Sequence, residues 1–246
     1  MRGTRLYLNL DLGPPDGITE LSDVDGFVVG PGVAEPPSQD AKHTWILRGV
    51  TPLDSPAWTE RDARWVCAEG LDHTMRLRDG WPQLTWVPRA EIYCPSVRYD
   101  FFAAAPGEGF SVYRPDTSTI QRHRVADDEA DLRDWLKRAK SQGFRTVWLH
   151  SRDAAGEGRG LDLDLLDRAR RSFGGGRIWL SGGATEPRHL ANLAVEGGAA
   201  AVILPRALAE RCGCGSLLAA LGWSDPATEL PSQGDSALPS AGTPTS

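Results

Sequence analysis

The stretch "RIWLSGGATEPRHLANLAVEGGAAAVILPRAL", Arg177 to Leu208, decides the fold. Two apolar runs of strand length, Arg177–Gly183 and Ala199–Pro205, enclose a segment with the apolar spacing of a helix. A strand, a crossover helix and a second strand form the unit from which parallel sheets are built. The glycine pair directly after the first run is the arrangement in which backbone N–H groups close on a phosphate. The stretch therefore predicts an α/β protein with a candidate anion site.

Apolar runs of similar length recur ahead of this stretch. They lie at Arg5–Asp11, Asp25–Gly30, His43–Gly49, Ala63–Gly70, Ala90–Val97 and Phe144–Ser151. Each is nearly continuous in apolar character, which is typical of a parallel strand covered on both faces. With the two runs above they make eight in a chain of 246 residues, which favours a closed (β/α)8 TIM barrel over an open sheet.

Three helices are predicted between the later strands, over residues 127–143, 161–176 and 185–198. Thr185 is the expected N-cap of the third. The expected inward residues are Leu132, Trp135, Leu136 and Ala139 in the first, Leu163, Leu166 and Ala169 or Arg170 in the second, and Leu190, Leu193 and Ala194 in the third. The segments after the second and third strands are short and rich in proline, so a shortened first half is expected.

The remaining composition narrows the class of protein. The net charge is −6 with no basic stripe, so nucleic acid is not an expected partner. No signal peptide and no membrane-length apolar run is evident, so we expect a cytoplasmic protein with no membrane partner. The four cysteines have no metal-binding spacing, so we expect reduced thiols and no metal, and we expect no cofactor. Residues 224–246 are rich in Pro, Ser, Gly and Thr, so we predict a barrel over 1–223 and a disordered tail over 224–246.

In such a barrel, ligands bind at the carboxyl ends of the strands. The chemistry-bearing residues at these ends are Asp11, Arg48, Glu69, Ser96, Arg98, His150, Ser151, Asp153, Ser181, Gly182, Gly183 and Arg206. The glycine pair with Arg206 beside it suits a phosphate, because a guanidinium offers a planar pair of donors to phosphate oxygens.

The segments "RTVWLHSRDAAGEGRGLDLDLLDRAR" and "RIWLSGGATEPRHLANLAVEGGAAAVILPRALAE" resemble the second half of the histidine-biosynthesis barrels. These are the phosphoribosylformimino-carboxamide ribotide isomerase and the cyclase subunit of imidazole glycerol phosphate synthase. The opening "RLYLNLDLGPPDG" resembles their first strand, and the stretch between is only loosely similar. The resemblance implies an Amadori-type rearrangement of a phosphorylated aminosugar by one carboxylate on the first strand and one on the fifth.

Carried over by resemblance, Asp11 matches the first-strand carboxylate, whereas Ser96 stands where the family has its fifth-strand aspartate. Asp153 matches the first acidic position of the loop after the sixth strand, but Ala155 occupies the second. The final turn has Pro205 where the family usually has glycine, which removes one backbone N–H donor.

The resulting assignment has Asp11, His150 and Asp153 as catalytic groups and Ser181, Gly182, Gly183 and Arg206 as the phosphate site. Arg48, Glu69, Ser96 and Arg98 are possible substrate contacts. A purely structural role remains an alternative for each group of these candidate residues. Asp11 and Asp153 can bind backbone N–H groups of their own turns, His150 can be a packed strand-end residue, the glycines can serve close packing, and Arg206 can form a surface ion pair.

Three functions remain open on this evidence. The first is a divergent sugar-phosphate isomerase-like enzyme acting on a phosphorylated ribosyl or aminosugar substrate. The second is a non-catalytic barrel that binds a phosphorylated metabolite or a partner protein, since Ser96 and Ala155 replace acids. The third is a lyase or synthase recruited to a specialised pathway. A glutaminase partner, which the cyclase relative uses, cannot be inferred from these residues.

Overall fold

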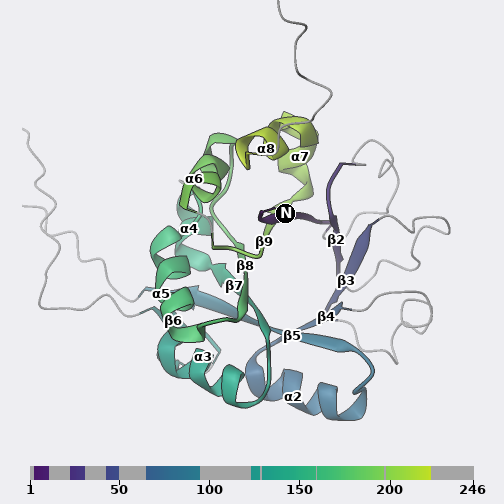
Figure 1. Cartoon of the computed structure of the whole chain (residues 1–246), viewed down its shortest axis with the longest axis vertical. Coiled ribbons are helices and arrows are strands. Elements are labelled where there is room, and N and C mark those ends of the chain that lie inside the picture. Colours follow the sequence, from purple (N-terminus) through teal and green to yellow (C-terminus); the bar gives the residue numbers. More distant parts are fainter. Residues whose placement is uncertain are drawn as a thin grey trace, which may run out of the picture.

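The structure is a computed structural model, and it describes residues 3–10, 23–30, 43–49, 65–94, 123–127, 129–158, 160–196 and 198–222. Figure 1 shows strands that run around a central space, with helices outside them. The predicted tail over 224–246, together with Asp11, Ser96 and Arg98, lies outside the described residues, so the domain boundary at 223 stays a prediction.

Eight parallel strands close into a barrel. They are β1 (Arg5–Asn9), β2 (Gly26–Val29), β3 (Thr44–Arg48), β4 (Trp65–Glu69), β5 (Thr85–Tyr93), β7 (Thr146–Ser151), β8 (Arg177–Ser181) and β9 (Ala201–Pro205). Each strand pairs with the next one around the barrel, β9 pairs with β1, and β4 pairs with β5, which leaves no open edge. The ninth strand, β6 (Arg124–Val125), is antiparallel to β5 and lies outside the ring. The predicted (β/α)8 TIM barrel is confirmed.

The helices lie outside this barrel. They are α2 (Leu71–Gly80), α3 (Leu132–Ser141), α4 (Arg152–Glu157), α5 (Leu163–Phe173), α6 (Arg188–Glu196), α7 (Arg206–Cys212) and α8 (Cys214–Ala220). None of the helices in the described residues combines the length and the apolar character that a bilayer crossing requires. Residues 11–22, 31–42 and 50–64, on which the prediction of a shortened first half falls, lie outside the described residues.

The helix predicted over 127–143 is α3, and its inward face is confirmed. All four residues expected there, Leu132, Trp135, Leu136 and Ala139, are buried. The helix begins later than predicted, because the carboxylate of Asp131 accepts a hydrogen bond from the N–H of Arg133 and caps it. Asp131 is therefore the N-cap of α3, and Asp134 lies in its first turn.

Two details of the other predicted helices are corrected. In α5 the buried residues are Leu165, Leu166, Ala169 and Phe173, whereas Leu163 is only partly buried. α6 begins at Arg188, beyond the predicted N-cap Thr185, whose hydroxyl donates to the carbonyl of Gly158 at 2.8 Å and so joins two loops. Leu190 and Leu193 are buried as expected.

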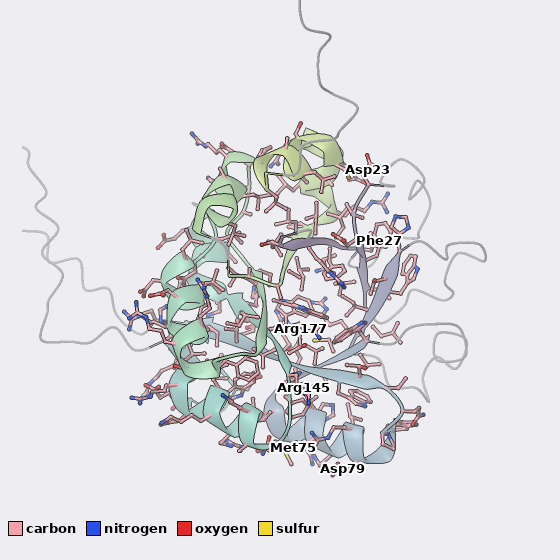
Figure 2. All side chains as sticks on the ribbon, in the orientation of Figure 1. Asp23, Phe27, Met75, Asp79, Arg145 and Arg177 are labelled. Carbon is pink, nitrogen blue, oxygen red and sulfur yellow. The ribbon has the colours of Figure 1, made fainter. Side chains whose placement is uncertain are left out.

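The interior of the barrel holds a core of its own, distinct from the larger core between strands and helices. Its buried members are Tyr7, Val28, Ile46, Cys67, Val87, Trp148, Trp179, Ala201 and Ile203. Figure 2 shows side chains filling this space between the strands. The ring of Trp179 lies 5.6 Å from that of Tyr7 and 5.4 Å from that of Trp65, so aromatic packing closes the interior toward the amino ends of the strands. Binding is therefore directed to the opposite end.

The position of the fifth strand was predicted wrongly. The strand covers Thr85–Tyr93, not Ala90–Val97. Pro88 lies within this strand, opposite Ala68 of β4. A proline removes one ladder hydrogen bond but leaves the extended backbone intact. As a result Arg89, Glu91 and Tyr93 belong to the strand's inner face, and Ser96 lies outside the described residues.

Candidate active site at the barrel mouth

The carboxyl ends of the strands bring polar side chains to one end of the barrel interior. Side chains along a strand alternate between its two faces. A residue two positions after an interior-core residue of the same strand therefore also faces the barrel interior. Among the described residues, this inner face includes Arg48 on β3, Glu69 on β4, Arg89 and Glu91 on β5, His150 on β7 and Ser181 on β8. Four of these six, Arg48, Glu69, His150 and Ser181, were predicted from the sequence. Arg89 and Glu91 were missed.

Arg89 is the centre of a charged group. Its side chain is only 7% exposed, and it donates to Glu69 Oε2 at 2.6 Å from Nη1 and to Glu91 Oε1 at 3.4 Å from Nη2. Its guanidinium lies over the ring of Trp148, 5.1 Å from the centroid. Burial disfavours the charged form of Arg89, but the carboxylates, Glu69 foremost, outweigh this and raise its pKa. The guanidinium is therefore a permanent cation beneath the mouth.

A second group links β7 and β8. The indole N–H of Trp148 donates to Ser181 Oγ at 2.7 Å, and Ser181 Oγ lies 2.9 Å from His150 Nδ1. An indole nitrogen can only donate, so Ser181 accepts from Trp148 and has its own hydroxyl hydrogen for His150 Nδ1. Because the Ser181 oxygen also has a second lone pair, this contact serves His150 Nδ1 in either neutral tautomer and in the imidazolium.

The two groups lie side by side. β5 and β7 are adjacent parallel strands in which Arg89 is opposite Trp148 and Glu91 is opposite His150. Neighbouring strands are about 4.8 Å apart, so the side chains of Glu91 and His150 emerge as neighbours at the mouth. A carboxylate and an imidazole next to each other, above a buried cation, are suited to proton transfer.

The glycine turn follows β8 directly. Gly182 and Gly183 have φ values of +99° and +92°, which side chains rarely adopt. A Cβ on Gly182 would lie 2.3 Å from the carbonyl oxygen of Ser151, and one on Gly183 would lie 1.9 Å from that of Gly160. Close packing of the backbone therefore requires both glycines. Within the described residues, the N–H groups of Gly182 and Gly183 have no hydrogen-bond acceptor in the protein, which leaves them available to an anion.

Arg206 and Asp153 have structural partners. Arg206 is the first residue of α7, and its Nε donates to Glu210 Oε1 at 2.5 Å, an ion pair between residues four apart on the same helix. Asp153 Oδ2 accepts the backbone N–H of Cys94 at 2.6 Å, which ties the end of β5 to the start of α4. Asp153 therefore anchors the backbone at the end of a neighbouring strand.

A buried Ser–Asp–His group lies outside the inner face. Asp162 Oδ2 accepts the hydroxyl of Ser151 at 3.0 Å and lies 3.5 Å from His123 Nε2, while its Oδ1 accepts the N–H of Leu165 at 2.8 Å. The carboxylate stands between the serine and the histidine, so the histidine cannot take the serine proton. This group caps α5 and joins it to β7. Burial opposes ionisation of Asp162, but the bonds from His123, Leu165 and Ser151 prevail and lower its pKa.

Metal and disulfide chemistry find no support in the described residues. No group of three or more His, Cys, Asp or Glu side chains there could hold a metal ion. The four cysteines, Cys67, Cys94, Cys212 and Cys214, are free thiols. Burial raises the pKa of the Cys67 thiol, which lies in the interior core, and Glu69 raises it further. Cys67 is therefore a packed thiol and not a nucleophile.

Comparison with known proteins agrees with this architecture. Residues 115–212 match the family model described as "Histidine biosynthesis protein". The matched region contains β6 to β9, with His150, Ser181 and the glycine turn, but not Glu69, Arg89 or Glu91. A search of the curated proteins finds no match to the chain. The chain is therefore a (β/α)8 barrel, and its residues 115–212 are similar to the histidine-biosynthesis proteins.

Proposed function

We propose that the protein is a divergent sugar-phosphate isomerase-like enzyme. Its reaction is an aldose–ketose or Amadori-type rearrangement of a phosphorylated ribosyl or aminosugar substrate. The observation that carries the proposal is the neighbouring placement of Glu91, His150 and Ser181 at the barrel mouth, next to a glycine turn with available N–H groups. Such a rearrangement moves protons between carbon and oxygen, so it needs titratable groups beside an anion anchor.

The phosphate is assigned to the turn after β8. The N–H groups of Gly182 and Gly183 act as donors, and the family match includes this turn. Ser181 is withdrawn from direct phosphate binding in this proposal, because its hydroxyl is shared between Trp148 and His150. Arg206 contributes only if its guanidinium exchanges Glu210 for the phosphate.

His150 is assigned to proton transfer, since an imidazole changes its charge close to neutral pH. The resemblance supports Asp11 as a second acid–base group, and this residue is tested by substitution. Asp153 is not retained as a catalytic group, because its carboxylate holds the backbone of Cys94.

Turnover assays with ribose 5-phosphate, ribulose 5-phosphate and an N-substituted ribosylamine 5-phosphate test the function. We expect turnover of at least one, and a loss of about 10²–10⁴-fold in kcat for His150→Asn, the usual contribution of an acid–base group. Asp11→Asn is assayed beside it, as the substitution that tests the carboxylate named by the resemblance. His73→Asn, an exposed histidine on α2, is the control and should leave kcat unchanged. Absence of turnover with every probe would contradict the proposal.

A non-catalytic metabolite-binding barrel is the second candidate. It is favoured by the structural partners of Arg206 and Asp153, two residues predicted to function. A thermal-shift titration separates the candidates, because a ligand at 100 times its Kd stabilises a protein by about 2.7 kcal/mol. Stabilisation by ribose 5-phosphate without turnover of any probe would favour the binding protein.

A further inference from the structure

We propose that Glu91 is the carboxylate that exchanges a carbon-bound proton of the substrate, that His150 is its partner acid, and that Arg89 is the positioning residue for Glu91. This rests on the proposed function, because it names the groups that perform the rearrangement. The resemblance places a serine, Ser96, where the family has its fifth-strand acid. In this proposal the acid is instead Glu91, which lies within β5 (Thr85–Tyr93).

The two carboxylates around Arg89 are not equivalent. Glu69 Oε2 is 2.6 Å from Nη1, whereas Glu91 Oε1 is 3.4 Å from Nη2. One guanidinium balances one carboxylate, and the shorter bond identifies Glu69 as its main partner. Glu91 keeps a looser contact, and its side chain is 39% exposed, close to the 45% of Glu69, so the distance alone distinguishes the two. Glu91 is therefore oriented by Arg89 yet able to reach a ligand at the mouth.

The surroundings of His150 complete the pair. On the strands beside it, the charged and polar inner-face groups among the described residues are Arg89, Glu91 and Tyr93 on β5 and Ser181 on β8. Ser181 holds Nδ1 at 2.9 Å, so proton exchange with a ligand takes place at Nε2. Trp148 contacts the residue that positions each member of the pair. Its ring lies against Arg89, which contacts Glu91, and its N–H donates to Ser181, which contacts His150.

These groups account for each proton of an aminoaldose rearrangement. His150 donates a proton to the ring oxygen as the C1–O bond breaks and the nitrogen lone pair forms a C1=N bond. Glu91 removes the proton from C2, and the electron pair forms C1=C2 as the C=N electrons return to nitrogen. Glu91 then delivers that proton to C1, while neutral His150 takes the proton of the C2 hydroxyl as the C2 ketone forms. Both groups return to their initial states, and no external oxidant or reductant is needed.

Paired substitutions of the two carboxylates test the assignment. Glu91→Gln should lower kcat by about 10²–10⁴-fold with little change in the midpoint of thermal unfolding. Glu69→Gln should lower the unfolding midpoint more than Glu91→Gln does, because it breaks the shorter bond to Arg89, and it should lower kcat less. Glu91→Asp should recover part of the activity. Glu157→Gln, an exposed residue of α4, is the control that should match the parent protein.

Arg89→Met provides a readout that a purely structural role would not give. Because Arg89 acts through Glu91, kcat should fall while KM for the same probe stays close to that of the parent protein. Equal kcat losses for Glu91→Gln and Glu69→Gln in an active protein would overturn this assignment and leave the proposed function standing. A parent protein that neither binds nor turns over any sugar-phosphate probe would remove the proposed function, and this assignment with it.

Discussion

Asp162 shows how a single residue connects several elements. Its carboxylate accepts the hydroxyl of Ser151 at the end of β7, caps α5 through the N–H of Leu165, and pairs with the buried His123. His123 is 6% exposed, and its Nδ1 has no hydrogen-bond partner among the described residues. The anionic form of Asp162 is thus favoured in the folded protein, which lowers its pKa.

Asp162→Asn should lower the free energy of unfolding by about 1–2 kcal/mol at pH 7, since asparagine still caps a helix but carries no charge. A carboxyl pKa that is lower in the folded than in the unfolded protein stabilises above the unfolded value, and this contribution is lost as pH falls through the folded value. Urea unfolding at pH 7 and pH 3 should therefore show a difference between parent and variant that shrinks at pH 3. Asp164→Asn, which breaks an exposed ion pair with Arg168, is the control with a change below about 1 kcal/mol. An equal difference at both pH values would contradict the role given to the charge.

At the scale of elements, the turn between β8 and α6 combines two constraints on the same glycines. Gly182 packs against the carbonyl of Ser151 at the end of β7, and Gly183 packs against Gly160. The N–H of Gly160 in turn donates to the carbonyl of Gly183 at 2.9 Å. The turn is therefore fixed by the neighbouring loop before any ligand is bound, which pre-organises the N–H groups proposed to bind phosphate.

Gly183→Ala should destabilise the protein by at least about 3 kcal/mol, because a left-handed backbone costs alanine roughly 1–2 kcal/mol and the overlap with Gly160 adds to it. Gly143→Ala separates the two causes. Gly143 has φ +84°, but a Cβ there would meet nothing within 4 Å, so only the backbone cost of about 1–2 kcal/mol is expected. Denaturant unfolding of both variants is the measurement. Similar losses for the two would show that the contact with Gly160 does not matter.

At the scale of the whole molecule, β9 closes the barrel. It pairs with β1 along Arg5–Asn9 and with β8, and its residues Ala201 and Ile203 belong to the interior core. Since the ring of strands has no other connection between β8 and β1, the stability of both halves depends on this strand.

A chain ending at Gly198 should lose cooperative unfolding, because the interior core around Tyr7 and Trp179 would open to water. A chain ending at Trp223 should keep the unfolding midpoint of the full chain if residues 224–246 form the predicted tail. Thermal unfolding followed by circular dichroism compares the two truncations. A marked loss of stability on removing 224–246 would show that the domain boundary at 223 is wrong.

The positions of most strands and of one helix face follow from local sequence patterns. Near-continuous apolar runs place strands within a few residues of their observed positions in seven of the eight cases, since a strand buried on both faces must be apolar throughout. The spacing of Leu132, Trp135, Leu136 and Ala139 determined the buried face of α3, because helical geometry is local. The glycine turn after β8 was also recognisable from the sequence, because a turn is formed by residues that are adjacent in the chain.

The composition of the candidate site depends on contacts between strands that are distant in the sequence. A lone arginine within the segment "VPRAEIY" gives no sign that it is buried, because burying a charge is unfavourable unless partners compensate it. The partner of Arg89 with the shorter bond, Glu69, comes from β4, and its aromatic contact, Trp148, comes from β7. The neighbours of Glu91 and His150 likewise follow from strand order and register, which are fixed only when the barrel closes. Local sequence sets which residues form a strand, and the closure of the ring sets which side chains meet inside it.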